Sequence, residues 1–235
     1  MRRALIPENM ENFLLKLSIM LVPALLAITC HEVSHGYVAS RFGDQTARSL
    51  GRLTLNPLKH LDIIGTIMVF LVGIGWAKPV PVDFRNLRNP KKDMIWVAAA
   101  GPATNFLLAA LSAGLLRVIA LLDRTVLAPW ATGLLLEPIS LMLAFSLYVN
   151  LLLCLFNLIP VPPLDGGRVV VGILPYRQAV AYSRIEPYGM IIIIVLVFFT
   201  KIFTYVLAPL LDLGIRFLAG PQSALVYNVT SFLMR

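Results

Sequence analysis

Long apolar runs occupy most of this 235-residue chain, at residues 13–38, 61–77, 94–122, 132–159 and 188–211. A helix of about 20 apolar residues crosses the hydrocarbon core of a bilayer, which is roughly 30 Å thick. Hydrophobic residues make up 58% of the chain and charged residues 14%, so a soluble globule would not have enough polar surface to cover itself. We therefore expect an all-α polytopic membrane protein, with a single membrane domain over residues 1–235.

Four of these runs are long enough to cross the membrane, whereas the run at 61–77 is short and contains glycine. Basic residues flank this short run on both sides. Because basic residues collect on the cytoplasmic side of a membrane, a simple crossing would leave one of the two basic flanks outside. We therefore predict about four full transmembrane helices plus one short segment at 61–77 that re-enters the membrane, with a fifth crossing as the alternative.

The first apolar run ends in the sequence HEVSH, at residues 31–35. Ionisable residues at membrane depth are usually functional. Residues four apart share one face of a helix, so the imidazoles of His31 and His35 can bind one zinc ion, with Glu32 beside the water as general base. The pattern H-E-x-x-H thus predicts two zinc ligands and one catalytic carboxylate.

A catalytic zinc ion usually has three protein ligands, so the sequence must supply a third. The candidates are His60, Asp62 and Asp165. Asp165 lies in the sequence NLIPVPPLDGGRVV, directly after the run at 132–159 and at the same predicted depth as the histidine pair. Its prolines end the preceding helix, and the glycines after it allow a sharp turn. Asp165 is therefore preferred, and His60 and Asp62 stay open.

Charge placement orients these motifs. If 61–77 re-enters, HEVSH and the sequence around Asp165 both fall on the side that holds most basic residues, which is the cytoplasmic side. These residues are Arg41, Arg48, Arg52, Lys59, Lys78, Arg85, Arg88, Lys91, Lys92, Arg168, Arg177 and Arg184. Residues 48–56 alternate around Leu53 and Leu55, which is a weak strand signal near the site.

Three motifs in order, HEVSH at 31–35, AGPATN at 100–105 and NLIPVPPLDGG at 157–167, resemble the site-2 protease family of intramembrane zinc metalloproteases. The resemblance implies a zinc-dependent endopeptidase that cuts in or near the transmembrane segments of membrane-anchored protein substrates, in regulated intramembrane proteolysis. It implies one zinc ion held by His31, His35 and Asp165, with Glu32 activating the water. Asn105 and Asn157 match family asparagines that orient substrate or stabilise the oxyanion.

Together with the apolar runs, the resemblance predicts that the domain consists of a zinc helix, a small membrane-associated β element with the re-entrant segment, a GPATN helix, a helix leading to LDGG and a C-terminal membrane segment. These parts correspond to residues 13–38, 44–92, 94–122, 132–167 and 188–211. The chain has no room for the PDZ or CBS domains of many relatives, so we expect selectivity to lie in the membrane core or in partners. Compact size and the lack of internal targeting signals favour a prokaryotic plasma membrane.

Other function classes fit the sequence less well. The net charge of +8 invites nucleic-acid binding, but the basic residues flank apolar runs, where they set membrane orientation instead, so no nucleic-acid partner is expected. A transporter that uses intramembrane His, Glu and Asp as an ion path is the alternative from another class. A transporter does not require the H-E-x-x-H spacing, and no inverted repeat is visible in the sequence.

Overall fold

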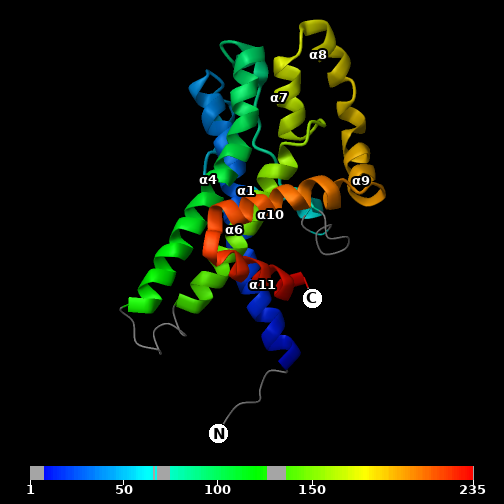
Figure 1. Ribbon diagram of the computed structural model, residues 1–235. Coiled ribbons are helices and arrows are strands. Elements are labelled where there is room, and N and C mark those ends of the chain that lie inside the picture. Colours follow the sequence, from blue (N-terminus) through cyan, green and yellow to red (C-terminus); the bar gives the residue numbers. More distant parts are fainter. Residues whose placement is uncertain (1–7, 66, 68–74, 126–135, 235) are drawn as a thin grey trace.

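The computed structural model describes residues 8–65, 67, 75–125 and 136–234, and these residues are mostly helical (Figure 1). Three long helices dominate: α1 (Glu8–Arg41), α4 (Pro90–Thr125) and α6 (Glu137–Asn157). The shorter helices are α2 (Thr46–Ser49), α7 (Asp165–Ile173), α8 (Tyr176–Ser183), α9 (Gly189–Phe199), α10 (Ala208–Ala219) and α11 (Ser223–Met234). Single turns link them at Pro57–Lys59, Phe84–Asn86, Glu186–Tyr188, Phe203–Leu207 and Gly220–Gln222.

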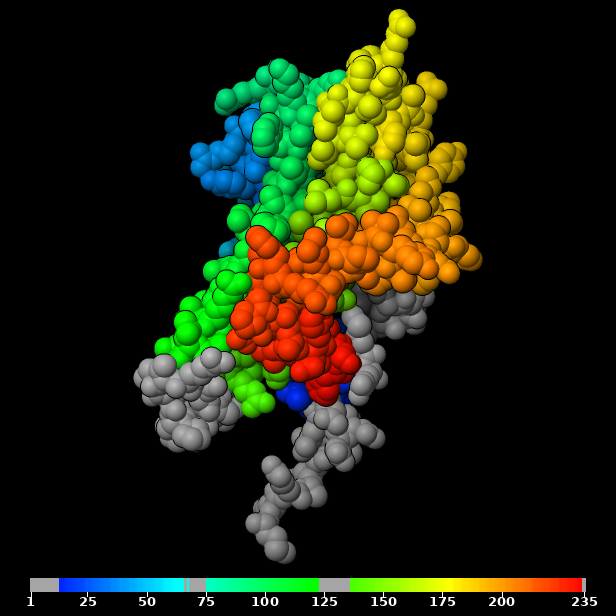
Figure 2. All heavy atoms as spheres, in the orientation of Figure 1, coloured from blue at the N-terminus to red at the C-terminus, as the bar shows by residue number. Residues whose placement is uncertain are grey.

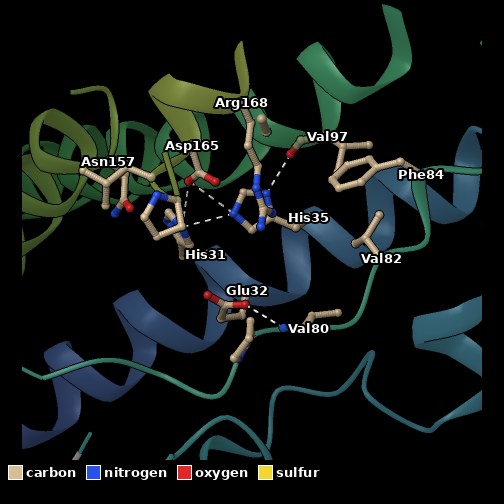
Figure 3. Close-up of a pocket in the computed structure, with 14 residues that line it drawn as sticks. His31, Glu32, His35, Val80, Val82, Phe84, Val97, Asn157, Asp165 and Arg168 are labelled. Carbon is tan, nitrogen blue, oxygen red and sulfur yellow. Dashed lines mark hydrogen bonds and ion pairs between the residues drawn. The ribbon is translucent and has the colours of Figure 1, made fainter. Parts of the chain in front are cut away.

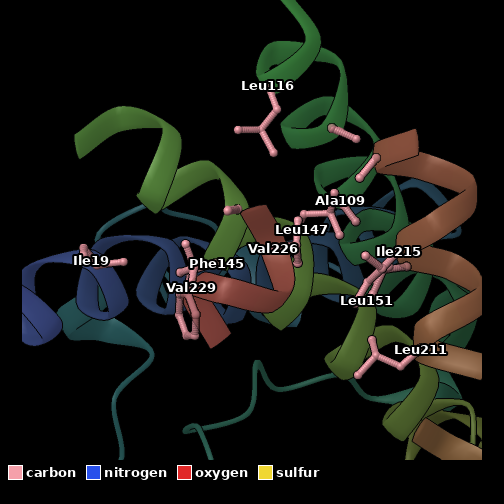
Figure 4. Packing of buried hydrophobic residues seen from close by; sticks show 13 residues of the cluster. Ile19, Ala109, Leu116, Phe145, Leu147, Leu151, Leu211, Ile215, Val226 and Val229 are labelled. Atoms are coloured by element: carbon pink, nitrogen blue, oxygen red, sulfur yellow. The ribbon is translucent and has the colours of Figure 1, made fainter. Parts of the chain in front are cut away.

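The three long helices pack against one another as a bundle, with α4 in contact with both α1 and α6. The buried cluster shown in Figure 4 joins these helices to α10 and α11. Small residues at Ala109, Ala113 and Ala144 are almost completely buried in this cluster. Small side chains allow apolar helices to approach closely, which is the main source of helix association in lipid. The bundle is thus a close-packed scaffold for whatever lies between α1, α4 and α6.

Five helical segments are long and apolar enough to cross a membrane: Phe13–Arg41, Pro90–Leu122, Glu137–Asn157, Tyr176–Phe199 and Phe203–Leu233. Many large side chains on their outer faces are exposed and apolar, including Val22, Leu107 and Phe199, which are 58%, 66% and 80% exposed. Such surfaces are stable in lipid rather than in water. The protein is therefore a multi-pass membrane protein, as its sequence predicts.

The C-terminal segments are less regular than their length suggests. The predicted membrane segment at 188–211 is divided, because α9 ends at Phe199, Thr200 is extended and helix resumes at Phe203. Gly220, with a φ of +56°, separates α10 from α11. Each of these two helices has 12 residues and is about 18 Å long, so Phe203–Leu233 reaches the length of a membrane crossing only as the sum of separate helices. Figure 2 shows α10 and α11, in orange and red, lying across one face of the bundle.

The region 44–92 differs most from expectation. The predicted strand at 48–56 is not formed: residues 46–49 are helical, Gly51 has a φ of +63°, and the described residues contain no neighbouring strand to pair with. The one β pairing among the described residues is an isolated antiparallel bridge between Leu61 and Ala77. Residues 66 and 68–74, on which the predicted re-entrant turn falls, lie outside the described residues.

Candidate metal centre

His31, His35 and Asp165 meet inside the bundle (Figure 3). The histidines lie one turn apart on α1, and Asp165 is the first residue of α7. His31 Nε2 and His35 Nε2 lie 3.1 Å and 3.3 Å from Asp165 Oδ2, and the two nitrogens lie 3.1 Å from each other. Ligand atoms around a tetrahedral zinc ion, with bonds of about 2.0–2.1 Å, are about 3.3 Å apart. The triangle therefore has the size of a zinc ligand set.

Hydrogen-bond acceptors on α4 fix both imidazole rings through their Nδ1 atoms. His31 Nδ1 lies 2.5 Å from Asn105 Oδ1, and His35 Nδ1 lies 2.7 Å from the carbonyl oxygen of Val97. The Asn105 amide nitrogen donates to Asn150 Oδ1 at 2.8 Å, so its oxygen is the atom that faces His31. Both Nδ1 atoms consequently carry a ring proton, and Nε2 is the ring atom of each histidine that faces Asp165.

These three atoms form a group that could hold a metal ion between them. Asp165 Oδ2 is buried and receives no hydrogen bond, although two nitrogens lie within 3.3 Å of it. Buried acceptors that face one another without a donor are strongly unfavourable. Two imidazole nitrogens and one carboxylate oxygen suit Zn²⁺. Within the described ranges, this is the one group of His, Cys, Asp and Glu side chains close enough to bind a metal ion.

The AGPATN sequence of α4 explains how the helix comes so close to the histidines. A Cβ atom at Gly101 would lie 2.5 Å from His35 Nε2 and 2.6 Å from His31 Nε2, so only glycine leaves room there. Pro102 lacks the N–H that would bond to the carbonyl one turn earlier, which weakens the helical hydrogen bonding beside Val97. Asn105 then lies one turn further along, against His31.

The turn before α7 places Asp165 opposite the histidines. The chain leaves α6 at Asn157 and folds back so tightly that a Cβ atom at Gly166 would overlap the backbone of Leu158. A Cβ atom at Gly167 would likewise overlap the backbone of Val161 and Pro162. The two glycines therefore bring the first turn of α7 against the end of α6, and α7 packs on α4.

Glu32 lies next to the candidate metal centre, but its hydrogen bond comes from a different part of the chain. It points toward an extended segment of chain (Figure 3), whose Val80 N–H donates a 2.8 Å hydrogen bond to Glu32 Oε2. A cavity of about 220 Å³ lies between this segment, α1, α4 and α7. Its walls are polar and apolar in nearly equal parts, and it is lined by His31, Glu32, His35, Pro79, Val80, Val82, Phe84, Val97, Ala98, Asn157, Pro163, Leu164, Asp165 and Arg168.

The two asparagines expected near the site lie in different places. Asn157 lines the cavity, and its amide nitrogen donates to the carbonyl oxygen of Leu153 at 3.0 Å. Asn105 is completely buried behind His31 and is not part of the cavity wall. Its position suits a residue that orients a ligand rather than one that touches substrate.

The alternative third ligands lie away from the histidines. His60 is 1% exposed, and its Nε2 lies 2.8 Å from the carbonyl oxygen of Thr54. Asp62 accepts a 2.8 Å hydrogen bond from the Gly65 N–H. Neither residue lines the cavity, so the structure brings Asp165, and not these two residues, to the histidine pair.

Two supporting groups were not found from the sequence. Asn150 is 1% exposed and continues the polar contact from Asn105 to Ser146, whose carbonyl oxygen accepts from the Asn150 amide at 2.9 Å. A polar amide side chain within an apolar run is a usable signal for such a role. The sequence gives no signal for the role of the Val97 carbonyl, because every residue has a backbone carbonyl.

Similarity to known proteins accords with this geometry. Residues 125–200 match the model of the family described as Peptidase family M50. The protein named "Putative zinc metalloprotease YwhC" of Bacillus subtilis is 40% identical over 195 residues, which cover 83% of this chain and 86% of that protein. This chain belongs to peptidase family M50. It is a zinc metalloprotease of the site-2 protease type.

More distant M50 relatives are longer than this chain. "Putative zinc metalloprotease Rip2" of Mycolicibacterium smegmatis is 31% identical over 178 residues, which cover 73% of this chain and 63% of that protein. "Putative zinc metalloprotease Rip3" of Mycobacterium tuberculosis is 34% identical over 154 residues, which cover 65% of this chain and 29% of that protein. No solved structure shows a significant similarity to the chain.

Proposed function

We propose that this M50 protein is an intramembrane endopeptidase that binds one zinc ion through His31, His35 and Asp165 and uses Glu32 as its general base. The observation that supports this most directly is the triangle of two imidazole nitrogens and one carboxylate oxygen, 3.1–3.3 Å apart. Both histidines belong to a segment that is otherwise apolar enough to cross a membrane. The peptide bonds that reach the site are therefore those of membrane-anchored proteins, in or near their transmembrane segments.

Zinc bound in the triangle would polarise the scissile carbonyl and make water more acidic near neutral pH. Glu32 accepts the proton of the attacking water and passes it to the leaving amine nitrogen. The Val80 N–H fixes one oxygen of the Glu32 carboxylate, which leaves the other oxygen for this transfer. The imidazoles contribute fixed lone pairs, because their Nδ1 protons are already used by Asn105 and Val97.

We place the site toward the cytoplasmic side of a prokaryotic plasma membrane. The C-terminal end of α1, the N-terminal end of α4 and helices α7 and α8 lie at one end of the bundle (Figure 1). Basic residues such as Arg41, Lys92 and Arg177 belong to this end, and basic residues favour the cytoplasm. Cysteines introduced at 48 and 177 should react only with reagents that reach the cytoplasmic face. Labelling from outside would reverse the orientation.

Metal content and cleavage together test the proposed function. Wild type, Glu32→Gln and Asp165→Ala are purified in detergent, their zinc is measured by mass spectrometry, and a tagged single-pass substrate is supplied. About one zinc per chain is expected in wild type and Glu32→Gln, with less in Asp165→Ala. Cleavage is expected in wild type alone.

Each other outcome would have a defined meaning. Cleavage by Glu32→Gln would remove Glu32 as the base. Full zinc affinity in Asp165→Ala would remove Asp165 as the third ligand. Zinc in wild type without cleavage of any membrane substrate would indicate a protein that binds but does not cut.

A further inference from the structure

Residues 78–88, which are irregular except for the single turn at Phe84–Asn86, form one wall of the cavity and are called the strap here. It supplies Pro79, Val80, Val82 and Phe84 to the cavity lining. The strap also supplies the Val80 N–H that binds Glu32. Because prolines at 79 and 81 have no N–H, Val80 is one of only two amide donors between residues 79 and 82. The placement of the strap therefore sets the orientation of the proposed base.

Asp44, which follows α1, is the main polar anchor of the strap. Its side chain is 0% exposed, so its charge is fully removed from solvent. It accepts from the Asp83 N–H at 2.9 Å and from Asn86 Nδ2 at 3.1 Å, both in the strap. It also accepts from the Thr46 N–H at 3.1 Å and the Thr46 hydroxyl at 2.5 Å. Four donors thus fill both oxygens of one buried carboxylate.

These contacts keep Asp44 ionised. Burial raises the pKa of Asp44, but hydrogen bonds from Thr46, Asn86 and Asp83 outweigh burial and hold the pKa below its usual value. Charge-assisted hydrogen bonds of this kind are roughly twice as strong as neutral ones. A buried, fully paired carboxylate is therefore a firm link between the end of α1 and the strap.

Other hydrogen bonds hold the two ends of the strap, and Asp44 binds the strap between them. Arg52 Nη2 donates to the carbonyl oxygens of Lys78 and Pro79 at 3.0 Å and 3.2 Å, and the Arg88 N–H donates to the Phe42 carbonyl at 3.0 Å. Near the centre, the strap lies so close to α1 that a Cβ atom at Gly36 would be 2.7 Å from Val80 Cγ1. The hydrogen bonds of Asp44 reach the strap between these end points.

We propose that Asp44 is a positioning residue for catalysis: by fixing the strap, it orients Glu32 and the cavity wall that faces the substrate. This inference rests on the proposed function. Asp44 itself does not line the cavity and touches no metal-ligand candidate. The proposed metal ligands come from α1 and α7, and their supports come from α4. Loss of Asp44 should therefore reduce catalysis without reducing zinc binding.

The test uses the full chain in detergent, with zinc content, thermal stability, kcat and KM measured for Asp44→Asn and Asp44→Ala. A displacement of about 1 Å at a reacting group can lower a rate by about 10²-fold. We expect Asp44→Ala to keep about one zinc per chain and to lose at least about tenfold in kcat, more than any change in KM. Asp44→Asn keeps an acceptor for Asn86 but turns an amide N–H toward the Asp83 N–H, so its loss should be intermediate.

Asp93→Asn is the matched control. Asp93 is also buried, and it accepts a 2.8 Å hydrogen bond from the Asn89 N–H at the start of α4, outside the strap. Its kcat should stay near the wild-type value. If Asp44→Ala does not fold, Asn86→Ala removes one of the two bonds from the strap to Asp44, together with a 3.4 Å bond from Asn86 to the Thr46 hydroxyl, and should lower kcat several-fold with zinc retained.

Three results would overturn the inference. The first is a wild-type kcat in both Asp44 variants. The second is a wild-type kcat in Asn86→Ala, where Asp44→Ala does not fold. The third is a loss of zinc in parallel with the loss of activity, because that result would indicate a merely structural role for Asp44. Glu32→Gln is included in the same assay to separate the two proposals. If Glu32→Gln cleaves normally, the proposed function has failed, whereas an inactive Glu32→Gln beside fully active Asp44 variants removes the role of Asp44 alone.

Discussion

The two sides of the cavity are supported by different parts of the molecule. On the metal side, the imidazoles of α1 are fixed by α4 through Asn105 and the Val97 carbonyl. On the base side, Glu32 belongs to the same turn of α1 but is fixed by the strap through Val80. Neighbouring residues of one helix thus depend on regions that are distant in sequence.

This difference predicts that metal binding and proton transfer can be separated by substitution. The metal side depends on close packing between membrane helices, in which a glycine and a buried asparagine are the critical residues. The base side depends on an extended loop held by a buried carboxylate. Changes on the first side should alter zinc and activity together, whereas changes on the second should alter activity alone.

The largest effect is expected from Gly101→Ala. The new Cβ atom would lie 2.5–2.6 Å from the Nε2 atoms of both histidines, which is closer than real Cβ contacts occur. At least one imidazole must therefore move, and zinc content and cleavage should both fall to background. Gly114→Ala on the same helix is the control, because no atom lies within 4 Å of its Cβ position. Retained zinc in Gly101→Ala would contradict the close approach of α4.

A smaller effect on the same side is expected from Asn105→Ala. Removal of the acceptor leaves the buried His31 Nδ1 proton without a partner, and loss of such a supporting group lowers metal affinity by about 10–100-fold. Chelator competition should detect this change, and added zinc should restore cleavage. Asn157→Ala is the control, since the Asn157 amide binds its own helix at the Leu153 carbonyl. Equal zinc affinity in the two variants would show that Asn105 does not hold His31.

The meeting of His31, His35 and Asp165 could be predicted from the sequence to a large extent. The spacing of His31 and His35 depends on helix geometry alone, and the apolar run before them indicated their depth. The position of Asp165 after a helix of membrane length indicated that it would lie at the same level. Asn105 was found as a candidate, but its burial behind His31 depends on how α4 packs on α1, which a single sequence does not specify.

The base side could be predicted only in part, because the H-E-x-x-H pattern indicates Glu32 but not the strap that binds it. Alternation around Leu53 and Leu55 predicted a strand, but alternation marks a strand only where a partner strand exists, and the described residues contain none there. The strap has no periodicity, because its conformation comes from two prolines and from the distant acceptor Asp44. The run at 188–211 was predicted as one membrane segment, but its helix breaks at Thr200. The mean hydropathy of a run does not show where a helix breaks.

The smallest effect, and the one that tests the comparison most sharply, is expected from Gly36→Ala. Gly36 lies one turn after Glu32 on α1, and its Cβ atom would meet Leu53 Cδ2 at 2.6 Å and Val80 Cγ1 at 2.7 Å. A third contact is to Ala47 Cβ at 3.0 Å, so the side chains of Leu53 and Val80 must move by roughly 1 Å to regain ordinary van der Waals contact. This movement reaches Glu32 through the Val80 N–H, so the displacement of the base should be smaller and should lower kcat by about tenfold or less. Zinc content should remain at the wild-type level, since the strap holds none of the proposed ligands. Gly114→Ala again controls for the added methyl group. Loss of zinc in Gly36→Ala would mean that the strap also supports the metal, and the two sides of the cavity would then be one cooperative unit.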